Sequence, residues 1–141
     1  MLGDDLMAKS YQFSLLSPLD VRRSLDTIMT DAPADIWGRY DADTCELVLA
    51  EALNNIVEHG QVPPEAPVLV NWAEHEVLQI TITDRGRPCP QSVIDGATLP
   101  DPDDMPEGGF GWAMIRMLCQ DLTYRHERGQ NTLGFSIQPR D

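Results

Sequence analysis

Three polar residues, Glu51, Asn55 and His59, recur at four-residue spacing in the stretch TCELVLAEALNNIVEHG, residues 44–60. At about 100° per residue in an α-helix, they form a row along the edge of an apolar stripe. The members of the stripe are Cys45, Val48, Leu49, Ala52 and Ile56. An Asn side-chain oxygen suits Mg²⁺, and a carboxylate one turn away can orient or deprotonate a nucleophile. Glu51 and Asn55 have that spacing, but a polar helix edge bonded to nearby backbone accounts for the row equally well.

The ends of this helix are also indicated by the local sequence. Asp43 followed by Glu46 resembles a capping box, and Gly60 suits the C′ position after the last turn. We therefore predict a helix over residues 44–59. His59 lies in its last turn, where an imidazole complements the helix dipole or bonds the last carbonyls, so we interpret His59 as structural.

A second candidate group follows a predicted strand. Asp84 comes directly after the alternating stretch VLQITIT, and Gly86 follows two residues later. A carboxylate at the end of a central strand can accept a hydrogen bond from an exocyclic amine such as that of adenine, and Gly86 would let the base pack closely. Considered alone, a turn-forming D-x-G explains these residues better.

A third group, the glycines Gly108, Gly109 and Gly111, precedes a predicted helix. Free backbone N–H groups and the positive end of the helix dipole attract phosphate there, and the missing Cβ atoms allow close approach. A glycine-rich helix entry by itself is more often only a turn. The pattern is not a Walker loop, because G-x-x-x-x-G-K-[ST] is absent.

Periodicity predicts the elements that position these groups. We expect strands over residues 10–16, 67–73, 77–83 and 131–138, and helices over residues 18–30, 44–59 and 112–122. The second and third strands should form a hairpin around the sequence EHE. From Asp84 to Glu107 the chain is rich in proline and acidic residues and lacks periodicity, which is typical of a lid or of disorder.

Composition limits the function classes. Ten Lys and Arg against 23 Asp and Glu leave a net charge of −13, which disfavours binding to nucleic acid or to anionic membrane and suits a basic protein partner. The chain has no run of about 18 apolar residues and no secretory signal, so we expect a cytoplasmic protein. Its 141 residues predict a single domain, and the scattered cysteines and histidines suggest neither a disulfide framework nor a zinc site.

The three groups together are more specific than any one of them. Their order, E-x-x-x-N-x-x-x-H-G, D-x-G-x-P and G-G-x-G, resembles the ATP-binding domain shared by gyrase, the MutL mismatch-repair proteins, sensor histidine kinases and a heat-shock chaperone. Within that superfamily the chain resembles the small anti-sigma factor serine kinases of bacteria. EALNNIVEHG, DRGRP, LPDPDDMPEGGFGWAMIRMLCQDLTY and the terminal GQNTL carry this likeness, which covers about residues 11–138.

The resemblance implies a fold and a set of roles. The fold is a two-layer α/β (α+β) sandwich of the Bergerat type, with a mixed, mostly antiparallel sheet, three helices on one face, and ATP beneath a lid of about residues 87–107. Glu51 is then the catalytic base for a serine hydroxyl, and Asn55 holds Mg²⁺. The remaining positions contact the nucleotide: Asp84 and Gly86 at adenine, Gly108, Gly109 and Gly111 at the phosphates, and Asn131 near the base, where relatives often have Thr.

Some positions depart from the pattern of these relatives. Phe110 stands where Arg is frequent, Trp112 where Leu is usual, and Cys89 where Phe is common. No Lys or Arg occurs from Pro88 to Glu107. Because phosphoryl transfer needs positive charge against the developing negative charge, Mg²⁺ would supply it almost alone unless Arg85, Arg87 or Arg116 reaches the site.

Two hypotheses follow from the resemblance. The first is an ATP-dependent serine kinase that binds a sigma factor and phosphorylates a small anti-sigma antagonist. The alternative is a non-catalytic ATP-binding module that controls a protein partner through its lid. The catalytic module of a sensor histidine kinase is disfavoured, because the chain shows no phosphoacceptor helix pair and no membrane span. A homodimer stays open as an assembly.

Overall fold

The computed structural model describes residues 7–96 and 111–141. The strands are β1 (Met7–Phe13), β2 (Val68–His75), β3 (Val77–Asp84), β4 (Gln120–Glu127) and β5 (Gln130–Ile137). The helices are α1 (Pro18–Asp31), α2 (Ala34–Arg39), α3 (Ala42–Asn55), α4 (Gln91–Asp95) and α5 (Gly111–Leu118). A π-helical segment, η2 (Ile56–Gly60), continues α3.

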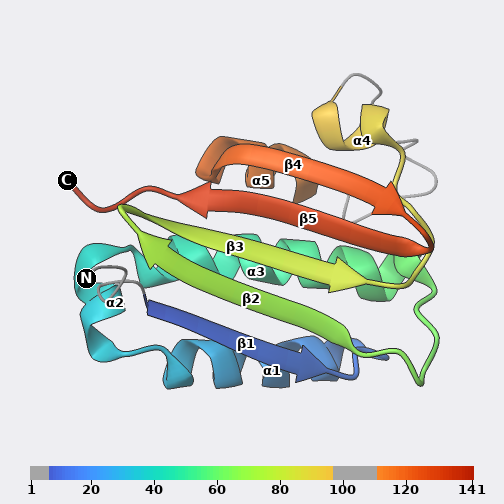
Figure 1. Cartoon of the computed structure of the whole chain (residues 1–141), viewed down its shortest axis with the longest axis horizontal. Helices are drawn as coiled ribbons and strands as arrows, with labels where there is room; N and C mark the ends of the chain where they lie inside the picture. Colours follow the sequence, from blue (N-terminus) through green and yellow to red (C-terminus); the bar gives the residue numbers. More distant parts are fainter. Residues whose placement is uncertain (1–6, 97–110) are drawn as a thin grey trace.

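The five strands form one sheet in the order β1-β2-β3-β5-β4. Helices α1, α3 and α5 lie side by side against one face of this sheet, and the opposite face is uncovered by the described residues (Figure 1). The predicted two-layer sandwich is therefore confirmed. All four pairings between the described strands are antiparallel, so this part of the sheet contains no parallel neighbours.

The hydrophobic core lies between these two layers. Leu78, Ile80 and Ile82 alternate along β3 and are buried, as their spacing predicts. Val48 and Leu49 of α3 are buried opposite them. The hairpin between β2 and β3 is tighter than predicted, because β2 continues to His75 and β3 begins at Val77, which leaves only Glu76 at the turn.

The helix predicted over residues 18–30 is confirmed, whereas both ends of the next helix differ from the prediction. The N-cap of α3 is Asp41 rather than Asp43, and the Asp41 side chain accepts a hydrogen bond from the Asp43 backbone N–H. At the other end Gly60 is not a C′ residue. The chain widens into the π-helical segment, and Gln61 adopts the left-handed conformation, with φ of 51°.

The helix predicted over residues 112–122 is too long. α5 ends at Leu118, where the Cys119 N–H still bonds the Ile115 carbonyl, and β4 begins at Gln120. Asp121 has a φ of 55°, which no right-handed helix can accommodate. The strand β4 was therefore missed from sequence. Among the helices of the described residues, none combines the length and the apolar character needed to cross a bilayer.

Candidate functional site

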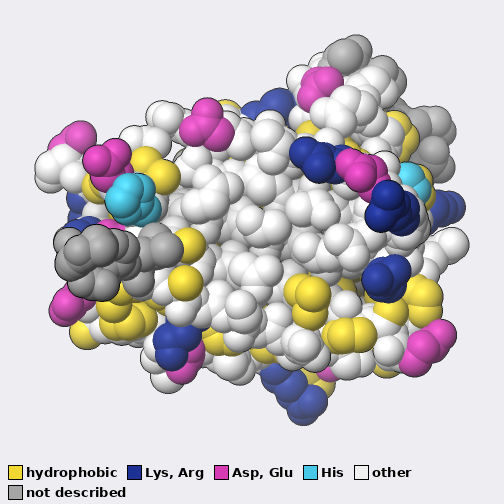
Figure 2. Space-filling view, viewed as in Figure 1, with side chains coloured by type: hydrophobic (Ala, Val, Ile, Leu, Met, Phe, Trp, Pro, Cys, Tyr) yellow, Lys and Arg dark blue, Asp and Glu magenta, His cyan; other side chains and the backbone are white. Residues whose placement is uncertain are grey.

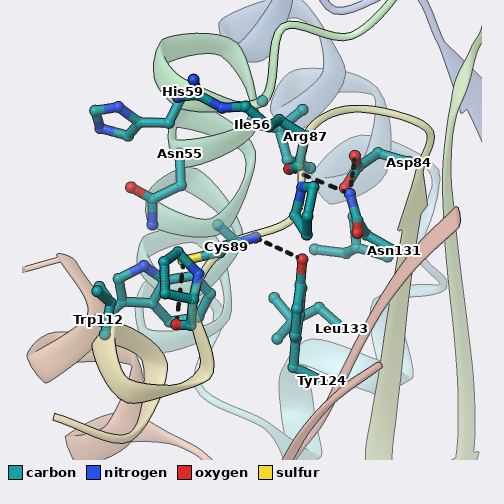
Figure 3. Close-up of a pocket in the computed structure, with 16 residues that line it drawn as sticks. Asn55, Ile56, His59, Asp84, Arg87, Cys89, Trp112, Tyr124, Asn131 and Leu133 are labelled. Atoms are coloured by element: carbon teal, nitrogen blue, oxygen red, sulfur yellow. Dashed lines mark hydrogen bonds between the residues drawn. The ribbon is translucent and has the colours of Figure 1, made fainter. Parts of the chain in front are cut away.

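A cavity of about 240 Å³ opens between α3 with η2 on one side and the ends of β3, β4 and β5 on the other (Figure 3). Its walls are mixed, with apolar side chains around a few polar groups. The lining residues are Ala52, Asn55, Ile56, His59, Gly60, Ile82, Asp84, Arg87, Pro88, Cys89, Pro90, Val93, Trp112, Tyr124, Asn131 and Leu133. A mostly apolar cavity with few convergent polar groups is typical of a small-molecule site.

Asp84 is the last residue of β3 and is only 8% exposed. Its Oδ1 accepts hydrogen bonds from the Gly86 backbone N–H at 2.7 Å and from Asn131 Nδ2 at 2.9 Å. These bonds hold one carboxylate oxygen and orient the other, Oδ2. A carboxylate is an acceptor only, so this group suits a ligand that donates through an amine.

Asn131 of β5 is buried and connects three segments (Figure 3). Its Nδ2 donates to Asp84 and to the Gly86 carbonyl at 3.0 Å, and its Oδ1 lies 2.7 Å from His126 Nδ1. Both amide hydrogens are therefore used within the protein. The structure places Asn131 in the cavity wall, where its contacts support the Asp84 carboxylate.

Gly86 and Gly60 are in direct backbone contact, which joins the D-x-G-x-P motif to the end of η2. The Arg87 N–H donates to the Gly60 carbonyl. A Cβ atom added at position 86 would overlap that carbonyl and lie 2.9 Å from Val62 Cγ2. Close backbone approach, rather than an unusual φ, explains this glycine.

We expect Gly86→Ala to destabilise the fold by about 1–3 kcal/mol, because the methyl group forces apart two packed backbones. Gly60→Ala is a matched control at the same contact: its Cβ would meet Val62 and Ile56 at 3.5 and 3.6 Å, which is ordinary van der Waals distance. Thermal melts of the two variants measure the difference. Equal melting temperatures would show that the contact is not tight.

Glu51 and Asn55 of α3 lie beside the start of α5. A Cβ atom added at Gly111 would lie 2.8 Å from Glu51 Oε2 and 3.7 Å from Asn55 Nδ2. The Glu51 carboxylate is thus beside the first residue of α5. Glu51 itself is half-buried and does not line the cavity, whereas Asn55 does.

The Asn55 amide is the one side-chain group of the described residues that is buried without a partner, at its Nδ2 atom. Figure 3 shows this side chain projecting from α3 between His59 and Trp112. As a donor, Nδ2 could bond an oxygen atom of a ligand, whereas Mg²⁺ would be bound by the acceptor Oδ1 of the same amide. Within the described residues, no three or more His, Cys, Asp or Glu side chains are grouped closely enough to hold a metal ion.

Two of the predicted phosphate contacts, Gly108 and Gly109, lie outside the described residues. Among the candidate cations, Arg116 does not face the cavity. Its Nη1 donates to the Ile94 carbonyl at 2.7 Å and so caps α4. Arg87 lines the cavity and Arg85 is exposed beside it. The cavity therefore has one arginine, at the end where Asp84 lies.

His59 lies in the last turn of η2, as the predicted dipole complement requires, and no side-chain bond to the last carbonyls is seen among the described residues. Its side chain is half exposed, lines the cavity rim, and has Nε2 3.5 Å from the Glu58 carboxylate. The π-helical turn shifts this residue from the position it would take in a regular helix.

Sequence reasoning missed Tyr124, whose hydroxyl accepts a hydrogen bond from the Cys89 N–H at 2.8 Å. The alternation of Leu122, Tyr124 and His126 was the available signal for this strand. Burial raises the pKa of Tyr124, and burial also raises the pKa of the Cys89 thiol, although Trp112 lowers it in part. Both groups are therefore neutral at neutral pH and serve as walls of the cavity.

Comparisons with known proteins agree with this architecture. Residues 20–137 match the family described as the histidine kinase-like ATPase domain. The signal transduction histidine-protein kinase AfsQ2 of Streptomyces coelicolor is 32% identical over 76 residues, which cover 54% of this chain and 14% of that protein. The chain thus spans a small part of the length of this curated relative.

Two solved structures share the fold. The RsbU and RsbW domains of Rv1364c from Mycobacterium tuberculosis match 96% of this chain and 33% of that one, with a TM-score of 0.57 and 17% identity. The mycobacterial sensor histidine kinase MprB matches 95% of this chain and 99% of that one, with a TM-score of 0.54 and 15% identity. Because the family match runs from α1 to β5 and includes the cavity, this chain belongs to the histidine kinase-like ATPase domain family.

Proposed function

We propose that this chain binds ATP with Mg²⁺ in the cavity and acts as a protein serine kinase that also binds a sigma factor, with a small anti-sigma antagonist as its phosphoacceptor. The observation that carries the proposal is the placement of Glu51 and Asn55 one turn apart on α3, both against Gly111 at the start of α5. The sequence resemblance to anti-sigma factor kinases supports the same conclusion.

Each residue has a distinct part in this proposal. Asp84 accepts a hydrogen bond from the adenine amine through Oδ2, while Gly86 and Asn131 hold Oδ1. Asn55 supplies an oxygen for Mg²⁺, whose charge opposes the negative charge that develops during phosphoryl transfer. The backbone N–H groups of the first turn of α5, which begins at Gly111, would bind the phosphates.

Glu51 is proposed to orient the acceptor hydroxyl and take its proton. Its carboxylate is near the nucleotide site without lining the cavity, which suits contact with a second substrate. Its Oε2 lies next to Gly111, at 2.8 Å from the position that a Cβ atom would take there, so the carboxylate is at the start of α5. This is the arrangement that a general base requires.

A non-catalytic ATP-binding module is the second candidate, and a specific observation favours it. Arg116 is held by the Ile94 carbonyl, and the sequence from Pro88 to Glu107 has no basic residue. Positive charge at the phosphates then comes from Mg²⁺ and backbone N–H groups. In this reading, nucleotide binding changes the affinity for a protein partner, and a second copy of the chain is one such partner.

Transfer of label from γ-labelled ATP to a co-encoded antagonist protein separates the two candidates. We expect label on a serine of the antagonist, dependent on Mg²⁺, together with ATP binding in calorimetry. ATP binding without serine labelling would reject the kinase and leave the binding module. Absence of ATP binding would reject both.

A further inference from the structure

Four arginines gather at one end of the sheet, next to the cavity. Arg85 and Arg87 follow the end of β3. Arg125 lies near the end of β4, and Arg128 lies in the hairpin that follows. Figure 2 shows basic side chains close together at the right-hand end of the open sheet face, where Figure 1 places the end of β3 and the β4–β5 hairpin. We name these four residues the arginine cluster.

The strand register brings the members of the cluster together. Asp84 of β3 pairs with Asn131 of β5, and Asn131 pairs with His126 of β4. The residues that follow Asp84 and those around His126 are thus separated by one strand, or roughly 10 Å. Segments about 40 positions apart in the sequence therefore place their arginines at one end of the sheet.

The charge of this surface is opposite to that of the chain. All four arginines are exposed, and Glu127, whose carboxylate lies 3.3 Å from Arg125, is the one exposed acidic residue of the segments 85–90 and 123–132. No ion pair joins Arg85, Arg87 or Arg128 to a carboxylate of the described residues. In a chain of net charge −13, the cluster is a local region of positive potential.

Arg128 has a backbone conformation that is unfavourable for a residue with a side chain. It and Gly129 form a two-residue turn between Glu127 and Gln130, with φ of 53° and 74°. A turn with both central residues at positive φ favours Asn, Asp or Gly at its first position, and an arginine there is strained.

We propose that the arginine cluster is a docking surface for an acidic segment of a protein partner. A short acidic segment can contact the cluster alone, whereas an extended nucleic acid would also meet the negative charge of the rest of the chain. Arg87 lines the cavity, so the docked partner lies at the cavity rim. The proposal concerns partner binding and does not depend on phosphoryl transfer.

The test uses a fluorescein-labelled polyglutamate peptide as the acidic probe and a labelled DNA duplex as the competing one. The triple variant Arg85→Glu, Arg125→Glu and Arg128→Glu reverses the cluster and leaves Arg87 in place. The triple variant Arg22→Glu, Arg23→Glu and Arg140→Glu makes the same charge change elsewhere. We expect saturable peptide binding that weakens with salt, falls at least about tenfold in the first variant, and changes much less in the second.

The Arg128→Asn variant separates binding from stability. Because asparagine tolerates the left-handed conformation, the melting temperature of this variant should rise by about 2–4 °C, while its peptide binding weakens. Calorimetry with ATP should be nearly unchanged in Arg128→Asn, since Arg128 does not line the cavity.

Three results would overturn the proposal. The first is wild-type protein that does not bind the peptide. The second is equal loss of peptide binding in both triple variants, which would reflect total charge alone. The third is tighter binding of the DNA duplex than of the peptide, which would make the cluster a nucleic-acid surface.

Discussion

Replacing Glu51 by Gln is expected to lower phosphoryl transfer to a protein serine by roughly 10²–10⁴-fold, the usual contribution of a general base. ATP affinity should remain near that of the wild type, because Glu51 does not line the cavity. Glutamine keeps the shape beside Gly111 and removes the basic oxygen, so packing at the start of α5 is retained. Single-turnover transfer and calorimetry measure the two quantities.

A matched control for this variant is Glu46→Gln, a half-buried glutamate of the same helix. It changes the net charge equally and should leave transfer intact. If Glu51 is only a structural polar residue, its replacement lowers the melting temperature, ATP binding and transfer together. Normal transfer in the Glu51 variant would remove this residue from the mechanism and favour the non-catalytic module.

Asp84→Asn is expected to weaken ATP binding by roughly 1–3 kcal/mol, or about 5- to 150-fold in affinity. The carboxylate now accepts from Gly86 and Asn131 through one oxygen and leaves the other for a ligand amine. A carboxamide has one oxygen, so its NH₂ group must face either those donors or the adenine amine. Either orientation places donor against donor.

The Asp84 variant requires a stability measurement beside calorimetry, because the residue also bonds protein groups. Asp26→Asn, on the exposed face of α1, controls for the loss of one negative charge. A folded Asp84 variant with wild-type ATP affinity would place the adenine elsewhere in the cavity or outside it. A variant with lower affinity at a preserved melting temperature would support the direct contact.

Much of the secondary structure could be predicted from the sequence, because it depends on local periodicity. The alternation of Leu78, Ile80 and Ile82 and the stripe of α3 each follow from residues close in the chain. The positions at which the helices begin and end were harder to predict. Asp41 and Asp43 are both acceptable N-caps, and the choice depends on where packing starts the helix. The strand β4 was missed because an apolar helical pattern continues to Leu122, whereas α5 ends at Leu118 and Asp121, with its left-handed φ, lies at an irregularity within β4.

The composition of the candidate site was also predictable, because its chemistry is written in short motifs. Glu51 and Asn55 are one turn apart on any helix. Asp84 and Gly86 are two positions apart in the chain and therefore stay close at the end of any strand. These distances are set by the backbone and need no tertiary information. The sequence alone therefore predicted residue types that could hold a nucleotide, and the family that the chain matches is one of ATPase domains.

Only the tertiary structure decided which of these groups meet. Asn131 bonds Asp84 across 47 positions, and Gly86 fits against the Gly60 carbonyl because α3 ends in a π-helical turn. Arg116, a candidate for the phosphates by its position, is instead held by the carbonyls of α4. Contacts between distant segments depend on strand register and on the packing of whole helices against the sheet, which no local pattern records.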